Sequence, residues 1–343
     1  MDKILANGER LIKKIDLKMK AIIQKIIDKQ SLTSDEAKAI IYSISEESLN
    51  EAEIVAIMIA IQTKGISIDE LDGFREALLE LSLPISLNAS EAIDVCGTGG
   101  DGKDTFNIST TSSFVLASMG FKVIKHGNYG VSSSCGSSNV LEELGIQFTS
   151  NEKELAISLK NKNICFLHAP LFHPTLKKVA HIRKQLAMKT FFNSIGPLVN
   201  PVQPKFQLSG TYSLELAKIY QHILKKSRNA YRVVYGMDGF DEVTFTNQTR
   251  VLGDHSDYMI DASQFGLKPI QLTDLKAGNT IKKSASIVKE ILKGKGSKAQ
   301  NQVVAINTAL AMNCFLPKES IQTLYQEALT FVESGQTAKT FKF

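Results

Sequence analysis

The stretch that decides the fold runs from Ala92 to Thr110 and reads AIDVCGTGGDGKDTFNIST. It predicts a buried strand over Ala92–Cys96, a glycine-rich loop, and then a helix. From this point on, short apolar runs alternate with helical patterns. The runs are Phe121–Lys125, Ile164–Leu167 and Arg232–Tyr235, and Ser213–Lys225 is one of the helical patterns. This alternation is typical of βα units and a mostly parallel central sheet.

The first ninety residues carry a different pattern, because their apolar positions recur at helical spacing. Three capping boxes mark helix starts at Thr33/Glu36, Ser48/Glu51 and Ser67/Glu70, and Gly65 is placed to end a helix. Five prolines crowd residues 170–204, which indicates that the chain leaves the sheet there. We expect an α/β protein with a small helical domain over 1–90, completed by about 175–205. The α/β domain would take 91–174 and 206–343.

Composition excludes several classes of protein. The 343 residues are 43% hydrophobic and 22% charged, unlike disordered, collagen-like or coiled-coil chains. The net charge of +5 is spread along the chain and does not indicate a nucleic-acid partner. The longest uncharged apolar run, Ile54–Ile61, is far shorter than the roughly 20 residues of a membrane helix, and no signal peptide is visible, so a cytoplasmic protein is expected. The spacing of the four cysteines favours neither disulfides nor zinc.

The glycine-rich loop is the strongest chemical signal. Gly97, Gly99 and Gly102 satisfy G-x-G-x-x-G, but a dinucleotide site needs an acidic residue about 20 positions later, and residues 105–141 contain none. Backbone N–H groups of such a loop can converge on a phosphate at a helix start. A second loop, KHGNYGVSSSCGSS over 125–138, has one lysine, three glycines and five serines, and is a second phosphate cradle or a flexible linker.

Two further features suit the chemistry of a phosphate substrate. Asp241 and Glu242 in DGFDE follow an apolar strand, and adjacent carboxylates suit Mg²⁺, although a solvated turn explains them equally well. Arg183 lies on a helix after His173-Pro174, where its planar guanidinium could clamp a carboxylate or simply face solvent.

The ordered set of motifs resembles the anthranilate phosphoribosyltransferase family over residues 30–340. The set comprises GTGGD with TFNIST, KHGN with SS and GS, HP with IRKQL, FN with GPLVNP, and DGFDE. This resemblance implies transfer of phosphoribosyl from phosphoribosyl pyrophosphate (PRPP) to the amine of anthranilate, two Mg²⁺ ions per subunit, and a homodimer made through the helical domains. It also implies a site in the cleft between the two domains, with no covalent nucleophile or general base.

The resemblance also implies a role for individual residues. PRPP would be bound by Gly97, Gly99, Gly100, Asp101, Thr105, Asn107, Ile108, Ser109, Thr110, Lys125, His126, Gly127, Asn128, Ser132, Ser133 and Ser137. Anthranilate would contact Gly97, His126, Asn128 and Arg183. The metal ions would be held by Ser109, Asp241 and Glu242.

The chain departs from the family pattern at four positions, with Tyr129 for Arg, Ser134 for Lys, Asn139 for Asp and Lys189 for Arg. Three cations are thereby lost or weakened, two of them in the second loop, which leaves open how that loop holds PRPP. Two alternatives remain at this point. One is an enzyme similar to pyrimidine nucleoside phosphorylases, and the other is a non-catalytic paralogue that binds nucleic acid.

Overall fold

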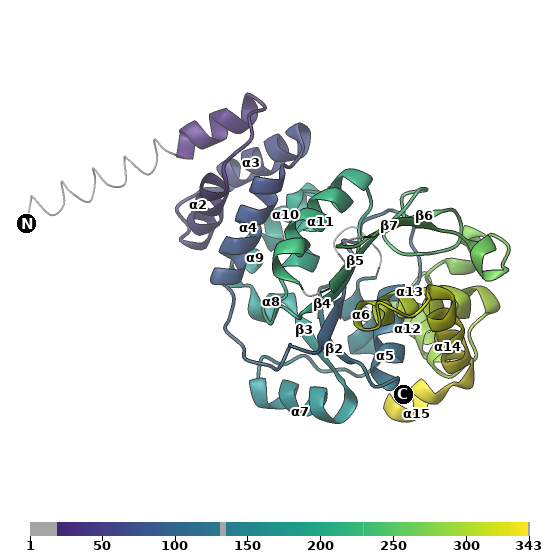
Figure 1. Ribbon diagram of the computed structural model, residues 1–343. Coiled ribbons are helices and arrows are strands. Elements are labelled where there is room, and N and C mark those ends of the chain that lie inside the picture. The colour runs from purple at the N-terminus through teal and green to yellow at the C-terminus, as the bar shows by residue number, and fades with distance from the viewer. Residues whose placement is uncertain (1–18, 131–134, 229, 255, 342–343) are drawn as a thin grey trace, which may run out of the picture. The chain divides into compact units, whose positions relative to one another are not determined.

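The computed structural model describes residues 19–130, 135–228, 230–254 and 256–341, which form two compact units (Figure 1). One unit comprises the chain through Ser82 together with Pro174–Ile195. The other comprises Leu83–His173 and Gly196–Phe343. Each unit is therefore assembled from two separate stretches of sequence.

The first unit is helical. Residues 19–27 form a helix, followed by α2 (Ser34–Ser45), α3 (Glu51–Lys64) and α4 (Ile68–Glu80). The expected capping boxes at Thr33 and Ser67 are confirmed, and Gly65 ends α3 at a φ of 87°. Gly73 lets α4 approach α2, because a Cβ there would lie 2.4 Å from the carbonyl oxygen of Ser34.

The expected start of α3 at Ser48 is wrong. Its capping box is formed by Asn50 and Glu53, whose side chains each accept a hydrogen bond from the backbone N–H of the other at 3.0 Å. Capping at Asn50 places Leu49 just before the cap and Ile54 in the first turn, and both are buried. This is the arrangement of a hydrophobic staple, which the alternative start would not give.

The later stretch of the first unit adds α9 (Pro174–Lys178), α10 (Ala180–Leu186) and the short 3₁₀ helix η1 (Phe191–Ser194). The Phe191 ring stacks on Phe74 of α4 with centroids 4.4 Å apart. Lys178 donates to the carbonyl oxygen of Ser45, and His181 lies 2.8 Å from Glu51. Aromatic burial and polar contacts thus join segments about a hundred residues apart.

The second unit is built on a seven-stranded sheet in the order β3-β2-β1-β4-β5-β6-β7. The strands are β1 (Ala92–Val95), β2 (Lys122–Gly127), β3 (Ile164–His168), β4 (Phe206–Gly210), β5 (Ala230–Gly236), β6 (Thr249–Leu252) and β7 (Asp257–Ile260). Strands β1 to β5 run parallel to one another, while β6 is antiparallel to both β5 and β7. The expected α/β fold with a mostly parallel sheet is confirmed.

Helices cover both faces of this sheet (Figure 1). The helices of this unit are α5 (Ile108–Ser118), α6 (Ser137–Glu143), α7 (Glu152–Lys162), α8 (Ala169–Phe172), α11 (Leu214–Ser227), α12 (Ile281–Leu292), α13 (Lys298–Phe315), α14 (Ile321–Ser334) and α15 (Gln336–Phe341). The 3₁₀ helices are η2 (Gly196–Leu198), η3 (Ala262–Phe265) and η4 (Leu272–Leu275). Strand residues alternate between two cores, so Ile164 and Phe166 pack on one face and Cys165 and Leu167 on the other.

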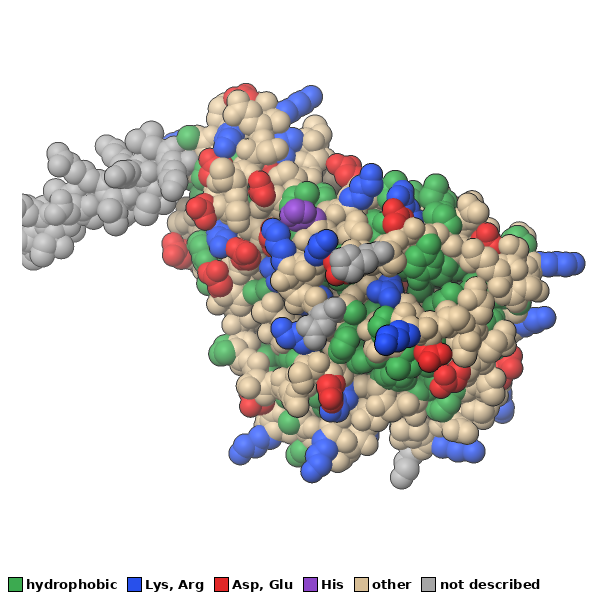
Figure 2. Space-filling view, in the orientation of Figure 1, with side chains coloured by type: hydrophobic (Ala, Val, Ile, Leu, Met, Phe, Trp, Pro, Cys, Tyr) green, Lys and Arg blue, Asp and Glu red, His purple; other side chains and the backbone are tan. Residues whose placement is uncertain are grey.

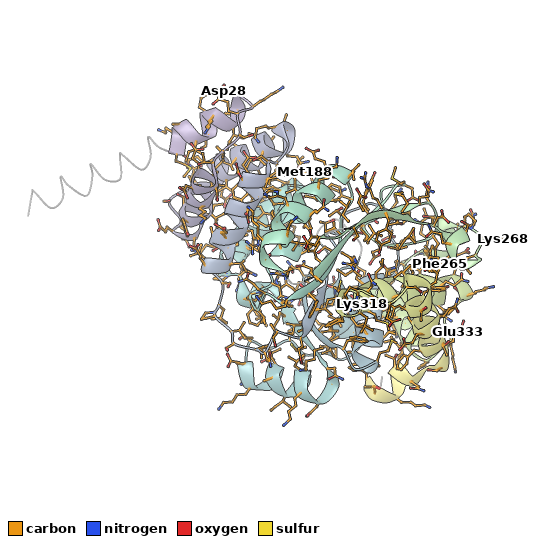
Figure 3. The ribbon with its side chains drawn as sticks, viewed as in Figure 1. Asp28, Met188, Phe265, Lys268, Lys318 and Glu333 are labelled. Carbon is orange, nitrogen blue, oxygen red and sulfur yellow. The ribbon has the colours of Figure 1, made fainter. Side chains whose placement is uncertain are left out.

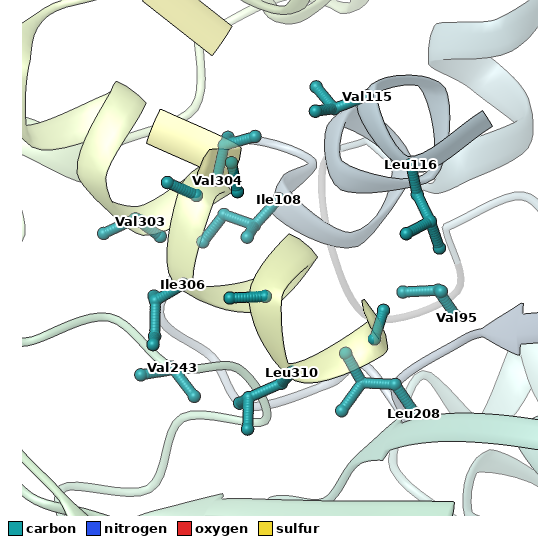
Figure 4. Close-up of a cluster of buried hydrophobic side chains, with 14 of the residues drawn as sticks. Val95, Ile108, Val115, Leu116, Leu208, Val243, Val303, Val304, Ile306 and Leu310 are labelled. Carbon is teal, nitrogen blue, oxygen red and sulfur yellow. The ribbon is translucent and has the colours of Figure 1, made fainter. Parts of the chain in front are cut away.

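The larger core joins β1 and β4 to α5 and α13 (Figure 4). It extends to Phe265, which is labelled in Figure 3 and packs its ring 4.8 Å from Tyr325. On the face shown in Figure 2, Lys and Arg side chains are interspersed with Asp and Glu. Within the described residues, no helix is both long and apolar enough to cross a membrane.

Candidate functional site

The glycine-rich loop connects the end of β1 to the start of α5. Gly99, Gly100 and Gly102 have φ angles of 63°, 70° and 73°, in the left-handed region that favours glycine. The loop is anchored to β4, because the N–H of Thr98 donates to the carbonyl oxygen of Gly210 at 2.9 Å. Backbone amides without side chains are thus presented beside a helix start, as a phosphate cradle requires.

Two carboxylates from the segment after β5 reach this loop. Asp241 Oδ2 accepts a hydrogen bond from Gly99 N at 2.7 Å. Glu242 Oε1 accepts from Ser109 N at 2.9 Å and from Ser109 Oγ at 2.6 Å. The structure therefore brings together all three residues that the sequence nominated for a metal. A freely solvated turn is excluded, since Asp241 is 7% exposed.

The electrostatics of the pair suit a cation. Burial and the neighbouring carboxylate of Asp241 raise the pKa of Glu242, against the hydrogen bonds from Ser109 that lower it. Asp101 adds to the same repulsion. Among the described residues no cluster of three or more His, Cys, Asp or Glu could hold a metal. Protein ligands here would be two carboxylates and a hydroxyl, a hard-oxygen set that leaves room for water or phosphate.

Close packing around Asp241 depends on two glycines. A Cβ on Gly97 would lie 2.5 Å from Asp241 Oδ2, and one on Gly210 would overlap the Asp241 carbonyl oxygen. Gly210 was not among the residues expected from sequence. In the sequence this position is marked only by a glycine. Its role becomes clear only from the structure, in which β4 pairs with β1.

The other residues of the first loop that were expected to bind PRPP differ in their contacts and in their burial. Asp101 Oδ1 accepts from Lys103 N at 3.0 Å, and Thr105 forms a bridge with Lys276. Asn107 Nδ2 reaches the carbonyl oxygen of Cys135 at 3.5 Å, which joins the first loop to the second. Ile108 and Thr110 are buried in the first turn of α5, so a ligand would meet their backbone rather than their side chains.

The second loop begins at the end of β2. Lys125 is buried and its ammonium donates to the carbonyl oxygen of Val95. Ser137 Oγ donates to the carbonyl oxygen of Asn128 at 3.3 Å, and Gly127 has no room for a Cβ beside that hydroxyl. A small pocket is lined by Lys125, Gly127, Ser137, Ser138 and His168, among others. Ser132, Ser133 and Ser134 lie outside the described residues.

His126 is buried beside this loop. Its Nδ1 lies 3.1 Å from the carbonyl oxygen of Gly196, and its ring meets His173 edge-on at 5.3 Å. Burial lowers the pKa of His126 to about 3, so the imidazole is neutral and Nδ1 carries the proton that the carbonyl accepts. Nε2 is buried with no partner in the described part of the chain. It is an acceptor available to a ligand donor.

Arg183 belongs to the first unit, on α10. Its side chain is buried and its guanidinium lies 5.6 Å from the ring centre of Phe192. Burial lowers its pKa to about 10, and Nε has no partner within the described residues. The solvent-facing alternative is therefore wrong. A buried guanidinium with no ion pair to the described residues is a strong candidate for an anionic ligand.

The chain is similar to known proteins in both sequence and fold. Residues 89–338 match the α/β domain of a glycosyl transferase family, and residues 20–82 match its helical bundle domain. The anthranilate phosphoribosyltransferase of Christiangramia forsetii is 46% identical over 94% of this chain and 98% of its own length. That of Bacteroides fragilis is 41% identical over 94% and 98%.

Solved structures of anthranilate phosphoribosyltransferases have a similar fold. The anthranilate phosphoribosyltransferase of Thermus thermophilus superposes with a TM-score of 0.85 at 27% identity, covering 94% of this chain and 97% of that one. The Saccharomyces cerevisiae enzyme in complex with PRPP and Mg gives a TM-score of 0.83 at 25% identity, covering 94% and 96%.

Proposed function

The chain belongs to the anthranilate phosphoribosyltransferase family, and from this premise we propose that it transfers phosphoribosyl from PRPP to the amine of anthranilate and releases pyrophosphate. The observation that carries the proposal is the junction of the glycine loop with Asp241 and Glu242. A phosphate cradle and a pair of hard-oxygen ligands then lie at one point. A nucleic-acid-binding paralogue would have no need of it.

Magnesium fits the residues present. Glu242 and Asp241 repel one another in a buried setting, and a cation would relieve the repulsion that raises the pKa of Glu242. Ser109, Asp241 and Glu242 would hold two ions per subunit, as in the family pattern. When bound, magnesium supplies charge neutralisation for the pyrophosphate leaving group.

The protein's own contribution is binding and alignment. PRPP would lie against the backbone of Gly97, Gly99, Gly100 and the first turn of α5, where neutral hydroxyl and amide groups supply further hydrogen bonds. Its other contacts would come from Asp101, Thr105, Asn107, Ile108, Ser109, Thr110, Lys125, His126, Gly127, Asn128, Ser132, Ser133 and Ser137. Positive charge develops on the ribose as pyrophosphate leaves, so stabilising the leaving group and orienting the amine supply the main acceleration. No covalent nucleophile is needed.

Anthranilate would be recognised by its carboxylate and its amine. Arg183 offers the carboxylate a buried guanidinium whose Nε–H has no partner in the described parts of the chain. Gly97, His126 and Asn128 would contact the rest of the acceptor. The aromatic amine is already neutral at pH 7, so a strong general base is not required.

A homodimer through the helical unit completes the proposal. Helix α3 buries Ile54, Ile57 and Ile61 in its own unit, yet Val55 and Ile59 on another side are only partly covered. An apolar second face is what a partner helix would cover. Ile59→Glu is expected to shift the protein toward monomer in analytical ultracentrifugation. An unchanged mass would exclude this face.

Loss of anthranilate fluorescence in the presence of PRPP and Mg²⁺ tests the function directly. The purified wild-type chain should consume anthranilate only when both are added. Absence of turnover, together with phosphorolysis of a pyrimidine nucleoside, would establish the phosphorylase alternative instead.

Variants of Arg183 test the acceptor site. Arg183→Ala should raise the KM for anthranilate roughly 10- to 150-fold, as expected for a hydrogen bond to a charged group, and change the KM for PRPP far less. Arg183→Lys should restore only part, because an ammonium lacks the planar fork. Lys184→Ala, at the exposed neighbour on α10, is the matched control and should be neutral. Equal losses for both substrates would move the acceptor elsewhere.

A further inference from the structure

Tyr129 stands where the family pattern has a cation, and its side chain has two contacts in the described chain. Its hydroxyl donates to Glu142 Oε1 in α6 at 2.7 Å. Its ring meets His168 edge-on, with centroids 4.6 Å apart and planes at 76°. The first residue after Asn128 is therefore tied to both α6 and β3.

His168 is the inner part of this cluster. It ends β3, is buried, and stacks on Phe148 with centroids 4.5 Å apart. Its Nδ1 lies 2.9 Å from Ser138 Oγ. Burial lowers the pKa of His168, while Glu142 raises it. The ring is thus fixed by a stack on one side and by a hydrogen bond at its edge.

The contacts close into a ring around Asn128. Ser138 N donates to the Asn128 carbonyl oxygen at 3.2 Å, and Tyr129 N donates to Asn128 Oδ1 at 2.8 Å. From Asn128 the path therefore runs through Tyr129, His168 and Ser138 and back to Asn128. Both the backbone and the side-chain carbonyl of Asn128 are held as acceptors, so the amide Nδ2 is the side-chain group that can donate to a ligand.

We propose that Tyr129, His168 and Ser138 are positioning residues that fix Asn128 and the Ser137 hydroxyl for substrate binding. This inference rests on the proposed function, which gives Asn128 and Ser137 contacts with the substrates. A loop that lacks the usual cations attracts phosphate less by charge, so its hydrogen-bonding groups have to be held in place before the substrate arrives. The aromatic and hydrogen-bonded ring supplies that order.

Tyr129→Phe and Glu142→Gln test the outer contact, at exposed positions where folding is not at stake. Each should raise the KM for PRPP or anthranilate about two- to fivefold, with kcat little changed. The double variant should be no worse than Tyr129→Phe alone, because without the Tyr129 hydroxyl the neutral acceptor of Glu142→Gln has no hydrogen bond left to weaken. Tyr42→Phe is the matched control, since Tyr42 makes the same type of bond to Glu80 in the helical unit. It should leave both KM values unchanged.

His168 variants test the inner contacts. His168→Phe keeps a ring against Tyr129 and Phe148 but removes the partner of Ser138, whereas His168→Asn keeps a polar atom near the Nδ1 position and removes the ring. Both should raise the same KM as Tyr129→Phe. Unchanged KM values in Tyr129→Phe and Glu142→Gln, with or without a fall in melting temperature, would overturn the proposal. Failure of the proposed function would show differently, as a wild-type enzyme that does not consume anthranilate.

Discussion

The loop after β1 is held by residues far away in the chain, whereas the loop after β2 is held mainly by its own neighbours. Gly99 and Ser109 bond to carboxylates 142 and 133 positions away. In the second loop, Asn139 Oδ1 accepts from Gly130 N and Gly136 N, and Tyr129 reaches Glu142 only 13 positions on.

This difference matches the different tasks proposed for the two loops. The first loop meets the carboxylates because β1, β4 and β5 are adjacent, so its chemistry depends on the whole sheet. The second loop can change its residues as a local set, and this set includes Tyr129 and Asn139, two of the four positions expected to depart from the family pattern. Long-range contacts therefore fix the proposed metal site, and short-range contacts allow variation in the proposed phosphate cradle of the second loop.

The largest expected effect comes from removing the long-range contacts. The double variant Asp241→Asn with Glu242→Gln should lower kcat/KM at least about 100-fold, because the ligands that suit magnesium lose their charge. Steady-state rates across a Mg²⁺ titration provide the measurement. Glu333→Gln, an exposed carboxylate in α14, should match the wild type. A double variant with the wild-type rate at limiting Mg²⁺ would refute the metal assignment.

A smaller but still large effect is expected at Gly97. The Cβ of Gly97→Ala would lie 2.5 Å from Asp241 Oδ2, so the carboxylate or the loop has to shift. Misplacement of this size should cost roughly 10- to 100-fold in kcat/KM and raise the Mg²⁺ requirement. Gly196→Ala, where a Cβ meets nothing within 4 Å, is the control. If both variants behaved alike, the contact with Asp241 would not matter.

His126 in the second loop should make the free energy of unfolding depend on pH. Its pKa is lowered to about 3 in the folded state, against 6.5 in the unfolded chain. The unfolded state therefore binds more protons between these values, and the free energy of unfolding falls as pH falls below 6.5. The slope is about 1.4 kcal/mol per pH unit, or tenfold in the unfolding equilibrium.

Urea unfolding at pH 7 and pH 5 measures this dependence. His126→Asn cannot ionise but can still donate to the Gly196 carbonyl, so it should lose stability less steeply than the wild type over this range. Parallel behaviour of the two proteins would mean that His126 does not remain neutral in the fold.

A smaller effect than at Gly97 is expected for the local contacts of Asn139. Asn139→Ala removes the acceptor for two backbone N–H groups and should raise the KM for PRPP about three- to tenfold. Asn139→Asp keeps both acceptors and carries the residue typical of the family, so it should stay close to the wild type. Steady-state kinetics decide, and an unaffected Ala variant would show that the loop is ordered by other groups.

The structural features that could be predicted from the sequence are those that depend on local signals. The capping boxes at Thr33 and Ser67, the strand at Ala92 and the left-handed glycines of the first loop each depend on a few adjacent residues. The start of α3 was misplaced because two overlapping patterns compete there, and burial of Leu49 and Ile54 favours the second one.

The sequence by itself determined the alternation of strands and helices, the two candidate phosphate-binding loops and the residue types at the candidate site. These properties depend on the spacing of residues that are close together in the sequence. Only the tertiary structure decided that Glu242 meets Ser109, that Gly210 has to lack a side chain, and that Arg183 is buried with no partner for its Nε among the described residues. The physical reason is that burial and electrostatic pairing depend on which strands and helices become neighbours in space. That adjacency is set by the packing of the whole chain.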